Sequence, residues 1–87
     1  MNTWRRHGRR EPYTTAGIRR LPCFRCGQPA EHQWSACSDG NLWRPVCLAC
    51  DVALNRLVLE WMGFSPAEVE AKITAYVERG MVAGRPL

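Results

Sequence analysis

The sequence predicts a small α+β domain, and three observations support this prediction. Two Cys-x-x-Cys pairs are separated by twenty residues, and they are Cys23/Cys26 and Cys47/Cys50. The segment between the pairs is typical of a β-hairpin, because Asp39-Gly40 suits a two-residue turn. After the second pair, apolar residues recur at the spacing of an α-helix.

The four paired cysteines predict a tetrahedral zinc site. Four thiolates close the coordination shell, so one structural Zn²⁺ would be held without an open position for catalysis. A disulfide framework is the alternative, but it needs an even number of cysteines and usually a secreted protein, and this chain has five. We expect the fifth, Cys37, to be a small buried side chain in a strand rather than another ligand or a reactive thiol.

The length of the chain explains why a metal is needed. With 87 residues there is room for one domain at most, and the compact part is expected between Leu21 and Gly80. Chains that short usually need an additional stabilising element, such as disulfide bonds or a structural metal. Structural zinc supplies on the order of 10–16 kcal/mol of apparent binding free energy in small fingers, so the predicted class is a zinc-stabilised domain.

Four segments are predicted along the chain. Residues 1–20 lack apolar periodicity, so they are expected to form an arginine-rich arm that is disordered or extended. Residues 21–64 form the zinc-binding domain, residues 65–80 a C-terminal helix packed on it, and residues 81–87 a short tail.

The hairpin prediction fixes a register. If Asp39-Gly40 is the turn, Ala36 pairs with Trp43, which places Trp34 and Trp43 on one face. The opposite face then carries Cys37, Leu42 and Val46. A change of one residue in loop length would exchange the two faces.

Two helices are predicted after the hairpin. The first begins within the second cysteine pair, ends at Gly63, and has an apolar stripe in which Trp61 is expected to be a core residue. That stripe consists of Leu54, Leu57, Val58, Trp61 and Met62. The second starts at Ser65-Pro66 with Glu68 placed for a capping box, and Gly80 is expected to stop it. Its stripe consists of Val69, Ile73, Tyr76 and Val77.

The stretch from Cys23 to Met62 resembles a treble-clef zinc finger, in which a zinc knuckle and a β-hairpin are followed by a helix that carries the second cysteine pair. The run of residues 39–45, Asp-Gly-Asn-Leu-Trp-Arg-Pro, resembles small zinc proteins of tailed phages and prophages. Treble clefs serve as nucleic-acid-binding modules, protein-docking modules and nuclease scaffolds, so the resemblance does not choose among these functions.

The HNH nucleases are one branch of the treble clefs, and Glu31-His32 and Asn41 are comparable with their acid-histidine pair and asparagine. The comparison fails at several points. His32 follows Cys26 by only six residues, and no histidine comes after it. Asp51 stands where the family often has asparagine. We therefore expect His32 to be an ordinary residue and the protein not to be an enzyme.

The charge distribution favours a nucleic-acid partner. The chain has a net charge of +4, of which residues 1–20 contribute six arginines against one glutamate, or +5, and the rest −1. Guanidinium groups suit phosphates and stack on bases. The predicted contacts are Arg5, Arg6, Arg9, Arg10, Arg19 and Arg20 of the arm and Arg44 of the hairpin. A solvated tail without a ligand is the alternative.

A protein-docking module is the second functional hypothesis, in which a phage factor would occupy a host enzyme or transcription complex. Four tryptophans in 87 residues exceed the need of a zinc-stapled core. Trp34 and Trp43 would form the docking patch if their hairpin face stays open. Because no apolar run resembles a signal peptide or membrane span, we expect a cytoplasmic protein with neither a membrane nor a small-molecule substrate as partner.

Overall fold

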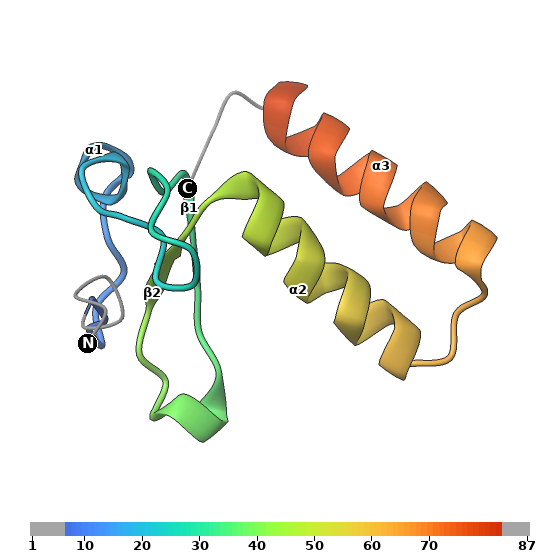
Figure 1. The fold of residues 1–87 in the computed structure, drawn as a ribbon, viewed down its shortest axis with the longest axis horizontal. Coiled ribbons are helices and arrows are strands. Elements are labelled where there is room, and N and C mark those ends of the chain that lie inside the picture. The colour runs from blue at the N-terminus through green and yellow to red at the C-terminus, as the bar shows by residue number, and fades with distance from the viewer. Residues whose placement is uncertain (1–6, 83–87) are drawn as a thin grey trace. The chain divides into compact units, whose positions relative to one another are not determined.

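The computed structural model describes residues 7–82 of the chain (Figure 1). Its elements are α1 (Thr15–Arg19), β1 (His32–Trp34), the 3-10 helix η2 (Cys37–Asp39), β2 (Arg44–Val46), α2 (Leu48–Trp61) and α3 (Pro66–Val82). The chain divides into two compact units, one ending at Asp51 and the other beginning at Val52. The predicted α+β class is confirmed: a β-hairpin precedes two long helices, and four cysteines cluster between the hairpin and α2.

The hairpin exists, but its register differs from the predicted one. β1 and β2 are antiparallel and pair Trp34 with Arg44, one residue away from the register in which Ala36 would pair with Trp43. The connection, residues 35–43, contains η2 followed by Gly40 and Asn41, which have positive φ values of 76° and 61°. The prediction of a two-residue Asp39-Gly40 turn is therefore wrong.

Side-chain bonding explains the longer connection. The carboxylate of Asp39 accepts two hydrogen bonds from the guanidinium of Arg44, at 2.6 and 2.8 Å. This bidentate pair holds the end of η2 against the start of β2 and lowers the pKa of Asp39 below its ordinary value. Cys37 opens η2 and is exposed, so its predicted place as a buried strand residue is also wrong.

The segment before α1 is bonded to the hairpin. Arg9 and Trp43 form an isolated antiparallel bridge, with backbone N···O distances of 3.2 and 2.6 Å. The side-chain amide of Gln33 then receives a hydrogen bond from the backbone N–H of Tyr13 and donates one to its carbonyl, at 2.8 and 3.0 Å. This part of the predicted arm is thus bonded to the unit that contains the four clustered cysteines.

The short helix α1 also corrects the prediction of a disordered or extended arm up to residue 20. Thr14 caps it by accepting a hydrogen bond from the N–H of Gly17 at 3.0 Å. Ile18 is fully buried, with 0% of its surface exposed. Burying an isoleucine side chain favours folding by roughly 1.5–3 kcal/mol, which offsets the entropic cost of ordering part of this segment.

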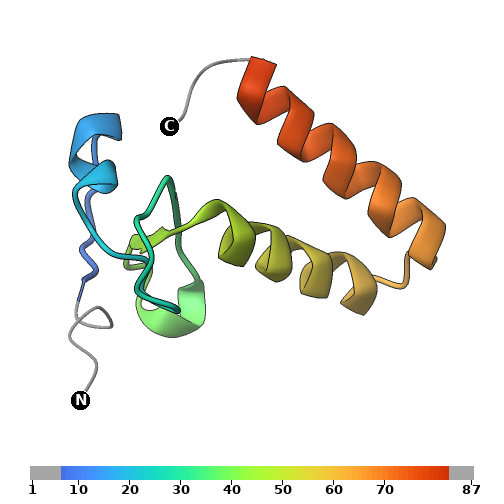
Figure 2. The same ribbon diagram turned by 45° about the horizontal axis from the view of Figure 1, so that its top comes forward.

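In the second unit, a short loop joins α2 to α3 (Figure 2), and both helix boundaries at this loop follow their capping residues. Gly63, with a φ of 91°, donates to Glu60 O while Phe64 donates to Leu59 O, which is the Schellman pattern at the end of α2. Ser65 and Glu68 exchange hydrogen bonds of 2.9 and 3.2 Å, so the predicted capping box is confirmed. α3 continues through Gly80 to Val82, so the predicted stop at Gly80 is wrong.

Two residues of the apolar stripe of α3 are buried and two, Tyr76 and Val77, are half-buried, whereas most of the stripe of α2 is exposed. Val69 and Ile73 are 2% and 6% exposed. Trp61 is 88% exposed, so the prediction that it belongs to the core is wrong. Leu57, Val58 and Met62 are also exposed. Among residues 7–82, no helix combines the length and the apolar character needed to cross a membrane.

Candidate metal centre

The first cysteine pair lies in a tight turn between α1 and β1. Gly27 has a φ of 83°, the left-handed conformation that glycine adopts without steric cost, and its N–H donates to the carbonyl of Cys23 at 2.9 Å. The N–H of Cys23 in turn donates to Gln28 O at 2.6 Å. The chain therefore reverses direction around Cys23 and Cys26 and presents both sulfurs on one side.

The second pair spans the start of α2. Cys47 precedes the helix and Cys50 lies in its first turn. The N–H of Cys50 points at Cys47 Sγ, with an N···S distance of 3.4 Å, and the N–H of Asp51 donates to the carbonyl of Cys47 at 2.9 Å. The helix begins inside the Cys-x-x-Cys pair, as the sequence predicts.

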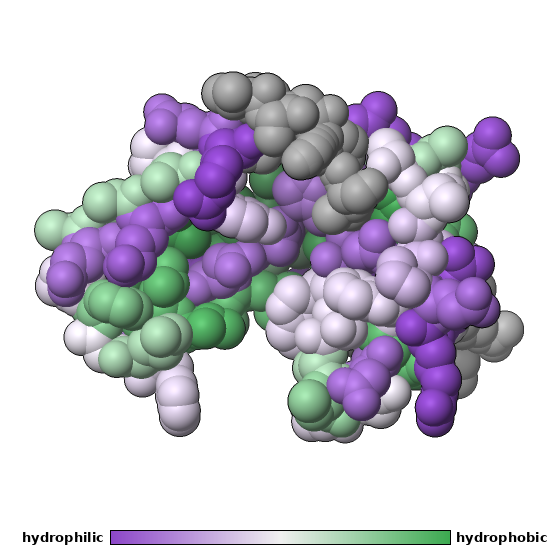
Figure 3. Space-filling model, turned by 180° about the vertical axis from the view of Figure 1, so that it is seen from behind, coloured by the Kyte–Doolittle hydropathy of each residue, from purple (hydrophilic) through white to green (hydrophobic). Residues whose placement is uncertain are grey.

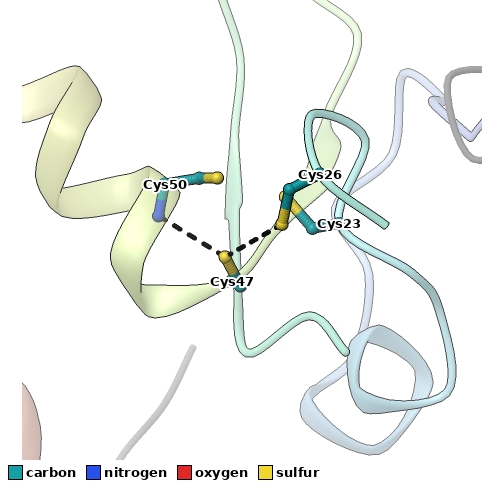
Figure 4. Close-up of side chains that lie close together, drawn as sticks. All are labelled: Cys23, Cys26, Cys47 and Cys50. Carbon is teal, nitrogen blue, oxygen red and sulfur yellow. Dashed lines mark hydrogen bonds between the residues drawn. The ribbon is translucent and has the colours of Figure 1, made fainter. Parts of the chain in front are cut away.

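The four sulfurs converge on one point (Figure 4). All four lie within 4.8 Å of one another, and Cys26 Sγ is 3.6 Å from Cys47 Sγ. A tetrahedral site with Zn–S bonds of about 2.3 Å has sulfur–sulfur separations of about 3.8 Å, so the cluster matches the size of a zinc shell. The donor set consists of soft sulfur ligands, which suit zinc among the common metals. Cys37 is not part of this cluster.

The protonation of the sulfurs also fits a metal site. Burial disfavours the thiolate of Cys23, but hydrogen bonds from its surroundings, including the N–H of Arg25 at 3.4 Å, outweigh burial and lower its pKa to about 6. Burial raises the pKa of Cys47 and of Cys50, and neighbouring sulfurs raise that of Cys50 further. Without metal, four thiolates so close together repel one another. A divalent cation held by the four sulfurs would neutralise that repulsion, and its binding would release the remaining protons.

A buried ion pair lies next to the cysteines in sequence. Asp51 directly follows Cys50 and is 2% exposed, and its Oδ2 lies 2.6 Å from Nδ1 of His32 at the start of β1. Because a carboxylate accepts, Nδ1 carries the proton. The hydrogen bond to Asp51 is the largest influence on His32 and raises its pKa. The pair therefore joins the first turn of α2 to β1.

We expect NMR titration of the His32 ring protons to give a pKa above the ordinary value of 6.5, since the bond to Asp51 favours the protonated ring. The pair then stabilises the folded chain below pH 6.5, and this contribution is lost as the pH rises through the folded-state pKa. Asp51→Asn should move the His32 pKa back towards 6.5. A wild-type pKa at or below 6.5 would contradict the ion pair.

The structure separates the predicted nucleic-acid contacts into two groups. Arg44 is bound to Asp39 and donates to His7 O at 3.0 Å, and Arg9 donates to the carbonyls of Glu11 and Pro12. The Arg9 guanidinium also lies over the Tyr13 ring, 4.3 Å from its centre. The Arg44 side chain therefore joins β2 to η2 and to His7, whereas the Arg9 side chain contacts its own segment, residues 11–13. Arg10, Arg19 and Arg20 are exposed, whereas Arg5 and Arg6 lie outside the described residues.

The predicted tryptophan docking patch is not an open pair. Trp34 and Trp43 are both half-buried, and the backbone of Trp43 is bonded to Arg9. The exposed tryptophan is Trp61, which periodicity alone assigns to the core because it falls on the apolar stripe of α2. Trp61 lies two residues before Gly63, which ends α2. This position at the end of the helix was the sequence signal that the apolar stripe extends beyond the packed part of the helix.

Comparison of the chain with protein-family models, with curated proteins and with solved structures finds no significant match. The interpretation of the site therefore depends on its own geometry.

Proposed function

We propose that this protein is a treble-clef module, stapled by one structural zinc ion, that binds nucleic acid through exposed arginines of its zinc-binding unit. The observation that carries this proposal is a set of exposed arginines in that unit. They are Arg10, Arg19, Arg20 and Arg25. Among residues 7–82, none of these four forms an ion pair with an acidic side chain.

The placement of these arginines supports a phosphate-binding surface. Arg19 and Arg20 end α1, and Arg25 lies in the turn between Cys23 and Cys26. Backbone hydrogen bonds connect these segments: Leu21 N donates to Ile18 O at 3.1 Å, and Ala30 N donates to Leu21 O at 3.0 Å. The arginines thus project from a framework that the cysteine cluster and Ile18 hold in place. Long flexible side chains on a fixed backbone are suited to contacts with a phosphate chain.

The salt dependence of binding tests this proposal. If Arg10, Arg19, Arg20 and Arg25 meet phosphates, fluorescence anisotropy with random-sequence DNA or RNA should give an affinity that falls with salt at a log-log slope of about −3.6, or about −0.9 for each contact. Replacing Arg10, Arg19 and Arg20 together by glutamine should make that slope shallower by about 3, because each lost phosphate contact removes about 0.9.

A matched pair of single substitutions separates a binding surface from net charge. Arg19→Gln and Arg56→Gln each remove one positive charge, but Arg56 lies in the second unit and pairs with Glu70. Only Arg19→Gln should change the salt slope, by about 0.9. Equal effects of the two variants, or no binding by the wild type at low salt, would refute the proposed surface.

A protein-docking factor is the alternative function, and the exposure of Trp61 favours it. Large aromatic side chains are enriched at the centres of protein interfaces, and an 88% exposed tryptophan has no role in the core of its own unit. This alternative places the contact on α2 rather than on Trp34 and Trp43. Absence of nucleic-acid binding by the full chain, together with a protein partner whose capture requires Trp61, would favour it.

A metal-dependent nuclease is the third candidate, and the His32–Asp51 pair is the observation in its favour, because a carboxylate-oriented histidine can act as a general base. In the described part of the chain, however, the four cysteines are the one group of three or more potential ligands placed to hold a metal. Incubation of plasmid DNA with the protein and Mg²⁺ or Mn²⁺, beside a His32→Ala control, tests this activity; intact plasmid rejects it.

A further inference from the structure

The second unit carries both a projecting aromatic side chain and a groove. Trp61, at the end of α2, is 88% exposed, and the neighbouring Leu57, Val58 and Met62 are 59%, 48% and 58% exposed. A groove of about 440 Å³ lies between α2 and α3. Its apolar lining is formed by Val58, Leu59, Ile73, Ala75 and Tyr76. Figure 3 shows hydrophobic side chains gathered on this part of the surface.

We propose that this face of α2 and α3 is a dimer interface, in which Trp61 of each copy enters the groove of the other. The occupant is a second copy of this chain because one surface contains both halves of the contact. Val58 belongs to the exposed apolar set and to the lining of the groove. Two-fold interfaces use the same patch on both subunits. A patch that carries both a projecting side chain and an adjacent groove can therefore bind the same patch of a second copy.

The spacing along α2 is compatible with that symmetry. If two copies of α2 cross antiparallel with the two-fold axis beside Val58, Trp61 comes opposite Asn55 of the partner subunit, since each lies three residues from the axis. Asn55 lines the groove. One geometry therefore brings both tryptophans to both grooves, and the apolar side chains of the stripe meet along the crossing.

The chemistry of the groove suits an indole ring. Lys72 and Arg79 line it beside the apolar residues, and cations are attracted to the face of an aromatic ring, most strongly to that of tryptophan. Lys72 already lies over the ring of Phe64, with its Nζ 4.5 Å from the ring centre. A tryptophan from a second copy would extend this arrangement without bringing an additional positive charge into the groove.

The available area predicts a weak dimer. The four exposed side chains of α2 present roughly 350 Å² per copy, from typical areas of aliphatic and aromatic side chains. With the lining of both grooves, the two copies bury roughly 1,000 Å², which is near the lower limit for a specific interface. The dimer should therefore form in the micromolar range and dissociate on dilution. Its formation is independent of nucleic-acid binding, which uses the other unit.

Sedimentation equilibrium of the full zinc-loaded chain tests the interface. From about 1 µM to about 1 mM, the wild type should show a monomer–dimer equilibrium. Trp61→Ala should weaken dimerisation at least about tenfold, as expected for a central aromatic contact. Glu60→Ala, a change at the exposed neighbouring residue, should leave it unchanged. The zinc content and helicity of Trp61→Ala should equal those of the wild type, because an exposed side chain contributes little to the monomer.

Mixing two variants tests the reciprocal contact. Ala75 lines the groove, so Ala75→Arg should block it while leaving Trp61 in place. A mixed dimer of Trp61→Ala with Ala75→Arg keeps one intact contact, in which the remaining tryptophan enters the open groove. The mixture should therefore associate more strongly than either variant alone. A wild type that stays monomeric, a Trp61→Ala variant that dimerises normally, or variants that do not associate with each other would overturn the proposal.

Discussion

Removal of zinc should unfold the first unit. The described core of this unit is small: its largest fully buried side chains are Ile18, Val46, Pro45 and Cys23, and the last of these is itself a proposed metal ligand. Structural zinc contributes on the order of 10–16 kcal/mol of apparent free energy in small fingers, which exceeds what such a core supplies. We expect a strong chelator to abolish the chemical-shift dispersion of residues 7–51 in NMR spectra, and added Zn²⁺ to restore it.

The cysteines themselves provide the matched control. Cys50→Ser removes one sulfur of the cluster and should produce the unfolded spectrum at ordinary zinc concentrations. Cys37→Ser makes the same chemical change at an exposed cysteine outside the cluster, and it should keep both the zinc content and the spectrum. A chelated chain with the dispersed spectrum of the zinc-loaded protein would contradict the metal-stapled fold.

The second large effect is expected at Ile18. Truncating a fully buried isoleucine to alanine typically costs about 2–5 kcal/mol, from the lost transfer free energy and the cavity that remains. Ile18→Ala should therefore lower the free energy of unfolding by this amount in denaturant titrations of the zinc-loaded protein. Since domains typically have only about 5–15 kcal/mol of stability, this loss would be a large share of the total.

Arg19→Ala is the control for this prediction, because Arg19 follows Ile18 in α1 and is exposed. It should change stability by no more than about 0.5 kcal/mol, as surface substitutions usually do. Equal stabilities of Ile18→Ala and Arg19→Ala would mean that the segment before Leu21 does not contribute to the free energy of unfolding. That result would fit a disordered arm and would contradict the burial of Ile18.

The parts of the fold that could be predicted are those encoded by local chemistry. The ends of the helices follow from Gly63 and from the Ser65–Glu68 capping box, because each capping bond joins residues close in sequence. The cysteine cluster could be predicted for a related reason: each pair needs only a short turn, and a metal ion bound by all four sulfurs would join the two turns. Gly27 in its left-handed conformation belongs to the same class.

The parts that could not be predicted depend on contacts between distant residues. Arg9 bonds to Trp43, and Tyr13 to the amide of Gln33, across separations that no local pattern reveals. α1 has five residues, too few to show helical periodicity. The hairpin register was wrong because Asp39 bonds to Arg44 instead of occupying a two-residue turn. A one-residue shift of this kind changes which side chains face the core.

The exposure of Trp61 could not be predicted for a similar reason. Periodicity identifies an apolar stripe on α2, but whether a stripe is covered depends on what packs against it. Residues of α2 that face α3 contribute to the groove, whereas Trp61 projects from the end of the helix. The same pattern can therefore indicate a core residue or an exposed one, and the structure shows that Trp61 is exposed.

The most direct measurement is X-ray absorption at the zinc edge on the purified full chain, combined with the ratio of zinc to protein. We predict one zinc per chain with four sulfur neighbours at about 2.3 Å, the distance typical of zinc–thiolate bonds. A folded chain that contains no metal, or a zinc ion with nitrogen or oxygen in its first shell, would contradict the structure proposed for this site.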